Sequence, residues 1–410
     1  MQLFKIIFLV LIFIISIFAN ENDEQNWNYF GEFQTYFAKI DKSNEHPQVK
    51  NYSELLNYNS IQLNIDYYND GFYFSVTPYA YTYYTESDEK IKSANFPEPF
   101  QVSDFFFRTF YMSYTMDKLT YGAGVLPLSN SFPMQYTSDY YQDGEGLSIV
   151  SDIDPLGFFI KYRFNDTNKI FAGIGLLDTS FVPAGNYLNE HQRDDSYGIF
   201  LTQKITYDKF KIINDFKYSN IMYNGVQAGK FYNLGSGISW NDSEHSGWTL
   251  YNVLAFSLYE NNTIAVRDEI LSDIGLAGVP TQFASSFVFD DKTYTGAANL
   301  FGFRKDLDIF SFDSFINFEW FHTFNDWISG NKGSLYNSNF NQLSNIRNNS
   351  YFINYGVRIN ELTTLKLNYA YLEFKEIVNI GAPSSTPVKE SIGSQRSSKE
   401  IVKLSFSYKF

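Results

Sequence analysis

Basic side chains recur at every second position in several apolar segments, so they share one face of an extended chain. Lys161 and Arg163, for example, alternate with Ile160 and Tyr162. We predict a net basic face that attracts anions. Its basic members are Lys161, Arg163, Lys204, Lys211, Lys217, Arg304, Arg358, Lys366 and Lys403. The acidic residues of the same parity are fewer: Glu32, Asp66, Asp215, Asp313 and Glu319.

A second charged segment, 128–157, is acidic and contains no Lys or Arg. If this segment folds against the basic face, the two attract each other and create a transverse field. The alternative is a loop exposed to solvent. A calcium site is a further option, although the spacing matches no EF-hand. The acidic residues are Asp139, Asp143, Glu145, Asp152 and Asp154.

Catalytic chemistry has little support among the titratable residues. The four histidines, His46, His191, His245 and His322, are scattered along the chain, and cysteine is absent. No Gly-x-Ser-x-Gly elbow and no His-x-x-x-His pair occurs. We therefore predict that the protein is not an enzyme and holds no cofactor and no metal ion.

Composition limits the class of protein and its partners. Asp and Glu number 45 against 31 Lys and Arg, a formal net charge of −14, so we expect no nucleic-acid surface. Only one apolar run approaches the length of a membrane helix, and it lies at 6–18, between Lys5 and Ala19. This pattern predicts a cleaved signal peptide over 1–19 and one exported domain over 20–410, with an uncleaved anchor as the alternative.

The exported part is a series of alternating segments of about ten residues, each with one apolar and one polar face. Tight turns separate successive pairs, as at Asn69-Asp70-Gly71. We place seven turns, near residues 70, 117, 167, 208, 244, 306 and 362, with longer loops between the pairs. One strand before the first turn (27–37) and one after the last (401–410) bring the count to sixteen.

The apolar face is present on nearly every segment, whereas the opposite face is polar and often charged. A soluble sandwich buries its apolar face, but a barrel in lipid requires the reverse arrangement. Burying so many charges in a dry interior is prohibitive, so we expect a water-filled lumen. The sequence therefore predicts an all-β, transmembrane antiparallel β-barrel of about sixteen strands, with short periplasmic turns and long extracellular loops.

The strand count, the turn spacing, the acidic third loop and the final Phe410 together resemble the sixteen-stranded bacterial porins over nearly all of residues 27–410. The resemblance is architectural, because the Pro-Glu-Phe-Gly-like stretch of many porin third loops is replaced here by Asp143-Gly144-Glu145-Gly146. It implies a Gram-negative outer-membrane protein, surrounded by lipid and lipopolysaccharide, that forms a homotrimer. Each pore would pass ions and small hydrophilic solutes by diffusion.

The last segment has the most regular alternation, with Phe406, Tyr408 and Phe410 on its apolar face and Lys403 and Lys409 on the other. By the same resemblance, Phe406, Tyr408 and Phe410 form a C-terminal insertion signal that the barrel-assembly machinery recognises.

The alternative function is a surface receptor or adhesin that acts through its long extracellular loops, above all 260–295 and 376–398. An actively driven transporter is disfavoured. That class resembles a barrel with a long plug domain before its first strand, whereas only residues 20–26 precede the first predicted strand here. The ion preference stays open, since a basic wall favours anions while acidic loops concentrate cations at the mouth.

Overall fold

The computed structural model describes residues 26–44, 52–87, 100–126, 155–177, 196–223, 226–266, 291–309, 312–325, 346–381, 386–389 and 397–410, together with Leu128, Leu147 and Trp327. Strands dominate these residues. They are β1 (Trp27–Asn44), β2 (Tyr52–Asn69), β3 (Phe72–Ser87), β4 (Phe100–Met116), β5 (Leu119–Val125), β6 (Leu156–Asn165), β7 (Asn168–Leu176), β8 (Tyr197–Tyr207), β9 (Phe210–Tyr223), β10 (Val226–Asp242), β11 (Trp248–Asn261), β12 (Thr293–Ile309), β13 (Phe312–Asn325), β14 (Ile346–Asn360), β15 (Thr363–Gly381), β16 (Thr386–Lys389) and β17 (Ser397–Lys409). The 3-10 helix η2 (Thr263–Val266) follows β11. Within these ranges, no helix combines the length and the apolar composition needed to cross a membrane.

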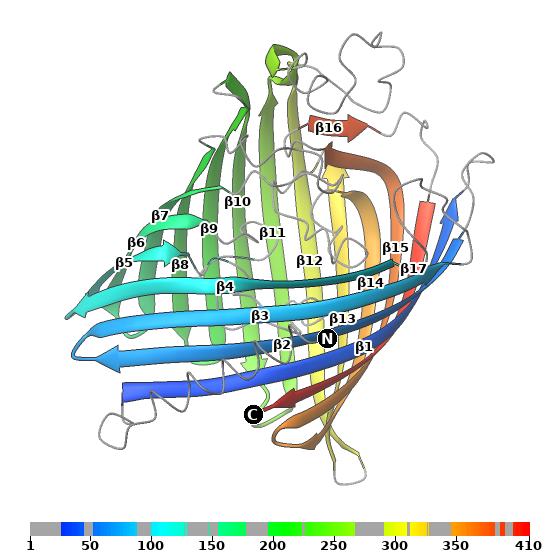
Figure 1. The fold of residues 1–410 in the computed structure, drawn as a ribbon, viewed down its shortest axis with the longest axis horizontal. Coiled ribbons are helices and arrows are strands. Elements are labelled where there is room, and N and C mark those ends of the chain that lie inside the picture. Colours follow the sequence, from blue (N-terminus) through cyan, green and yellow to red (C-terminus); the bar gives the residue numbers. More distant parts are fainter. Residues whose placement is uncertain are drawn as a thin grey trace.

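Sixteen of the strands form one closed antiparallel barrel. Each strand pairs with its neighbours in chain order, and β17 pairs both with β15 and with β1. The short β16 pairs only with β15, as a hairpin beyond the barrel wall. Figure 1 shows β1–β4 crossing in front of β9–β12, with β17 beside β1 where the barrel closes. The predicted all-β barrel of about sixteen strands is confirmed.

Tight turns join the strands at one end of the barrel, which we call the turn end. Asp70 and Gly71, between β2 and β3, have φ values of 45° and 83°, so both central residues are left-handed. That is the backbone of a type I′ hairpin, whose twist matches the two strands it joins. Asp117 and Asp208 also have positive φ at their turns. The turns predicted near 70, 117, 167, 208, 244 and 362 are all found.

The turn predicted near residue 306 is wrong. β12 continues through that segment, and Asp306 and Asp308 pair with Phe315 and Asp313 of β13. β12 ends at Ile309 and β13 begins at Phe312, and the two residues between them lie outside the described residues. The charged run resembles a turn, but the Nε of Arg304 lies 2.8 Å from Asp306 Oδ1, so the charges are paired within the strand.

The expected alternation of short turns and long loops also fails once. Only two residues, 224 and 225, separate β9 from β10 at the loop end of the barrel, and Tyr223 pairs with Val226. The sequence there is Asn-Gly, a strong hairpin signal that the prediction of a longer loop overlooked. The strands β5–β7 are also short, at 7–10 residues, so the wall is lowest where the third loop leaves it.

The barrel closes between β1 and β17, from Glu32–Lys409 to Asn44–Ser397. Beyond the last pair, Gly31 and Phe410 exchange two backbone hydrogen bonds of 2.7 and 3.0 Å. The Phe410 ring covers Gly31 so closely that a Cβ at this position would overlap it. Gly31 is therefore needed for the close approach of the aromatic ring to the first strand.

Candidate pore interior

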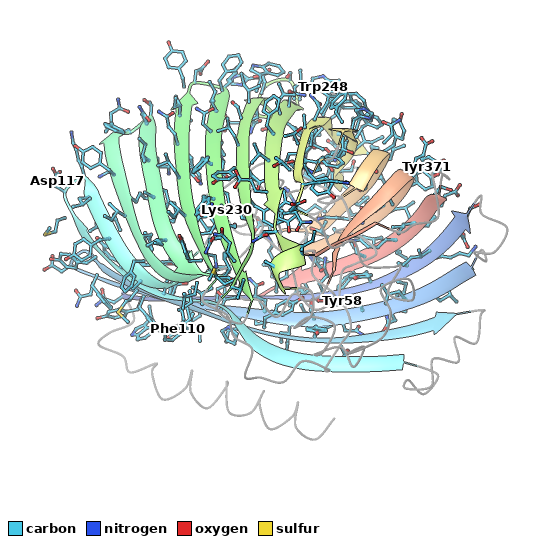
Figure 2. The ribbon with its side chains drawn as sticks, turned by 90° about the horizontal axis from the view of Figure 1, so that it is seen from above. Tyr58, Phe110, Asp117, Lys230, Trp248 and Tyr371 are labelled. Carbon is cyan, nitrogen blue, oxygen red and sulfur yellow. The ribbon has the colours of Figure 1, made fainter. Side chains whose placement is uncertain are left out.

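Most barrel strands have one face of buried side chains and one face of exposed apolar side chains. On β11, Tyr251, Val253 and Ala255 are at most 3% exposed, whereas Leu254 and Phe256 are 47% and 57% exposed. Because the sheet is closed, the buried face is the interior and the exposed face is the outer surface. Figure 2 views this ring of strands from above. Large apolar side chains on the outside are typical of a barrel surrounded by lipid.

The nine basic residues predicted to line the interior all lie at inner-face positions. Lys204, Lys217 and Lys403 are buried. Lys161, Lys211, Arg304 and Lys366 are half-buried, and Arg163 and Arg358 are exposed near the turn end. They are distributed over β6, β8, β9, β12, β14, β15 and β17, so basic groups occur around much of the inner wall.

The inner-face acids divide into covered and open groups. Asp215 and Glu319 are at most 1% exposed, whereas Asp313 is exposed and lies 3.4 Å from Arg358. Glu319 accepts a 2.6 Å hydrogen bond from the Tyr251 hydroxyl. Charges this well covered contact protein rather than bulk solvent. The interior is therefore closely packed around these two carboxylates.

One residue of the third loop is inside the barrel. The five acidic residues predicted for the constriction, Asp139, Asp143, Glu145, Asp152 and Asp154, lie outside the described residues. Leu147 of the same segment is fully buried, and its backbone N–H donates a 2.8 Å hydrogen bond to Asp215 Oδ2. Thr202 donates to the other oxygen of Asp215, also at 2.8 Å. The described contact is thus between a backbone donor and a wall carboxylate, a pairing that charge counting did not predict.

Much of the loop-side half of the inner face is apolar, although Ser257, Asn261 and Ser350 are also buried there. We call this surface the apolar collar, and the sequence analysis missed it because it looked for charge. Leu147 and the fully buried Trp327, which follows β13, belong to the same packed cluster. The members of the collar are Ala38, Ile40, Leu56, Tyr81, Val253, Ala255, Ala298, Leu300, Phe321, Phe352, Ala370, Leu372 and Ile401.

A stack of tyrosines lies on the inner wall of β1–β3. The rings of Tyr36 and Tyr58 are 4.8 Å apart and nearly parallel, and those of Tyr58 and Tyr81 are 5.8 Å apart. Tyr58, labelled in Figure 2, also shares a short hydroxyl–hydroxyl bond with Tyr79. Lys403 of β17 places its Nζ 4.9 Å from the Tyr36 ring centre, a cation–π contact across the closure of the barrel.

At the turn end, charged groups tie neighbouring turns together. Lys209 Nζ lies 2.5 Å from Asp242 Oδ1, and His245 Nδ1 lies 3.5 Å from the same oxygen. The hydrogen bond from Lys209 holds the pKa of Asp242 below its usual range. The same bond raises the pKa of Lys209. Lys305 of β12 donates to the Ser246 carbonyl, which joins a third strand to this turn.

The residues of the predicted insertion signal lie on the outer face of β17 and just after it. Tyr408 is 39% exposed and Phe410 is 50% exposed, and their rings stack at 6.3 Å. Phe406 is half-buried and pairs with Thr35 of β1. An exposed aromatic row fits the membrane interface.

The described histidines are at the surface. His322 stacks on Trp320 at 5.6 Å and lies 3.3 Å from Asn349 Oδ1, on the outer face of β13. His245 is in the turn already described, while His46 and His191 lie outside the described residues. Within the described ranges, no group of three or more His, Cys, Asp or Glu side chains is arranged to hold a metal ion.

No known family model matches the sequence, and no curated protein matches it either. An anion-selective porin from Comamonas acidovorans has a TM-score of 0.50 at 10% identity, over 94% of this chain and 99% of that chain. OmpF of Salmonella typhi, solved with daunomycin, gives 0.49 at 11% identity over 94% and 98%. OmpT of Vibrio cholerae gives 0.47 at 9% identity over 94% and 97%. At such identities the likeness is one of fold: this chain is a porin-like β-barrel.

Proposed function

We propose that this protein is an outer-membrane porin that lets ions and small hydrophilic solutes diffuse through its lumen. The observation that carries the proposal is the inside-out surface of a closed barrel. Apolar side chains such as Leu254 and Phe256 face outward, and charged ones such as Lys217 and Asp215 face inward. This distribution suits a wall between lipid and a polar path.

The third loop is the proposed constriction. The bond from Leu147 to Asp215 supports this role, because it ties one residue of the loop to the inner wall. The acidic members of the loop would then face the basic wall and set up a field across the narrowest part of the path. No enzymatic activity and no cofactor form part of the proposal.

The remaining expectations follow from residence in the outer membrane. They are export behind a cleaved signal peptide over 1–19, a surrounding of lipid and lipopolysaccharide, and insertion by the barrel-assembly machinery through Phe406, Tyr408 and Phe410. We also propose a homotrimer with one pore in each subunit. A receptor or adhesin that acts through its loops is the competing function.

Single-channel recording tests the proposal directly. The protein, refolded and inserted into a planar bilayer, should give stable ohmic steps, and a salt gradient should yield a reversal potential that reports its ion preference. Steps in groups of three would support the trimer. A folded, inserted barrel that passes no current would reject the porin and favour the receptor.

A further inference from the structure

A row of polar side chains crosses four neighbouring strands on the inner face, directly below the apolar collar. Asn317 of β13 pairs with Asn354 of β14, and Asn354 pairs with Asn368 of β15. Asn368 in turn pairs with Lys403 of β17. Directly opposed residues of antiparallel strands have their Cβ atoms about 5 Å apart, so these four side chains are consecutive neighbours. We call them the amide row.

The amides are buried and incompletely hydrogen-bonded. Asn317, Asn354 and Asn368 are at most 2% exposed. Within the described part of the chain, the Nδ2 atoms of all three have no hydrogen-bond partner, and neither does Asn354 Oδ1. Two residues nearer the turn end than Lys403, Ser405 Oγ is in the same state, and so is Oε1 of Gln34, which pairs with Ser407.

Buried polar groups in proteins are almost always paired, because each one left unpaired loses its solvation without compensation. Single unpaired atoms also occur elsewhere in the described part of the chain, as at Ser219 Oγ and Tyr29 Oη, but the four amide atoms of the row belong to three directly neighbouring side chains. The collar residues next to the row, Phe352, Ala370 and Ile401, have no polar side-chain atoms. Water or a solute that enters the lumen would supply the missing hydrogen-bond partners of the row.

The chemistry of the row is rich in donors. Three side-chain NH₂ groups lead to the ammonium group of Lys403, so the row suits a ligand with several oxygen acceptors and a negative charge. The charge belongs at the Lys403 end. At the other end Asn317 is two residues from Glu319, a buried carboxylate that would repel an anion, and its own Oδ1 already accepts from Tyr251.

We propose that the amide row is a binding subsite for polyhydroxylated carboxylates, the class of the sugar acids. The carboxylate contacts Lys403, and the hydroxyl groups contact Asn368 and Asn354. Two strand spacings separate Lys403 from Asn354, roughly 10 Å, which matches an extended six-carbon acid. The inference rests on the proposed function, because the solute reaches the row only through the lumen.

The test is block of the chloride current through single channels in a planar bilayer by added gluconate. Gluconate should block at lower concentration than acetate, which has only the carboxylate, or sorbitol, which has only the hydroxyls. Asn354→Leu should weaken the gluconate block about tenfold, as expected for the loss of its hydrogen bonds. Lys403→Gln should weaken gluconate block but leave any sorbitol block unchanged.

Asn252→Leu is the matched control, since Asn252 lies on the outer face of β11 and is hydrogen-bonded to Asn299. It should leave the block unchanged. Equal block by gluconate and acetate, or a gluconate block that survives Asn354→Leu, would overturn the subsite while the porin stands. If the barrel is silent, the porin fails, and calorimetric titration of the folded protein in micelles with gluconate decides the subsite by the same Asn354→Leu comparison.

Discussion

Gly31 allows the final aromatic ring to pack across the junction between the first and last strands of the barrel. The ring of Phe410 occupies the space that a side chain at residue 31 would fill, while the two backbones exchange hydrogen bonds. On the inner side of the same junction, Lys403 lies over Tyr36. The closure is thus supported on both faces by side chains and between them by the paired backbones.

Gly31→Ala should displace the Phe410 ring and lower the free energy of unfolding by about 1 kcal/mol, the lower end of the cost of overpacking. Urea unfolding of the barrel in detergent micelles measures this loss. In a Phe410→Ala background the same substitution should cost less, because the ring it displaces is absent. Equal costs in the two backgrounds would mean that the ring does not contribute to the closure.

Asp215 is the wall residue that holds the third loop at Leu147. Asp215→Ala removes the acceptor and leaves a buried N–H unpaired, at a cost of about 1–3 kcal/mol to the inward loop position. We expect a larger and noisier single-channel conductance. Asp215→Asn removes the charge but keeps one oxygen acceptor, so its conductance should stay nearer that of the parent. If Asp215→Asn changed the conductance more than Asp215→Ala, the charge of Asp215 and not its contact with the loop would set the conductance.

Contacts between residues of different strands and loops are difficult to predict from the sequence. Alternation alone assigns Asn354 and Asn368 to the same face as Lys403, but it does not give the register that makes them neighbours. Leu147 and Trp327 are equally hidden, because an apolar residue in a polar loop has no partner until the barrel exists. The basic inner positions were predictable because parity within one strand is enough to place them.

At the scale of elements, the turn between β10 and β11 depends on ionised groups. The lowered pKa of Asp242 gives stability that is present above its ordinary value of 3.8 and lost as pH falls through the lowered value. The raised pKa of Lys209 gives stability that is present below its ordinary value of 10.5 and lost as pH rises through the raised one. The contact between Lys209 and Asp242, which links the β8–β9 turn to the β10–β11 turn, should therefore persist between these two pH limits.

Hydrogen exchange at residues 243–247, corrected for its intrinsic pH dependence, measures this link. Protection should fall as pH drops through the lowered pKa of Asp242, and Asp242→Asn should reduce protection at neutral pH and abolish the acid transition. The turn between β2 and β3, built on Asp70 and Gly71, is the internal reference. Loss of protection at both turns together would indicate general acid unfolding of the barrel.

Most elements were predictable because period-two alternation and turn chemistry are local. The two failures are also local. The run Lys305-Asp306-Leu307-Asp308 has the composition of a turn. Two of its charges nevertheless have partners within or beside the strand, since Arg304 contacts Asp306 and Lys305 lies over the Trp248 ring. At 224–225 the hairpin signal is present in the sequence, but the expected regularity of long loops took precedence over it.

At the scale of the molecule, the inner wall has more basic than acidic positions although the chain as a whole is acidic. Lys161 and Arg163 lie on the inner face of β6, within the low part of the wall. Reversing both charges with Lys161→Glu and Arg163→Glu should shift the ion selectivity toward cations, seen as a changed reversal potential in a salt gradient. An unchanged potential would remove these two residues from the path of the ions.

The pairing of β1 with β17 has a consequence for folding. Every other junction in the barrel joins strands that are near in sequence, but this one joins the two ends of the strand order, so its loop-closure entropy is the largest in the molecule. Until it forms, the sheet has two free edges whose backbone groups are open to pairing with other chains. Barrel closure should therefore be the last and slowest step, and the half-built sheet is the species most prone to aggregate.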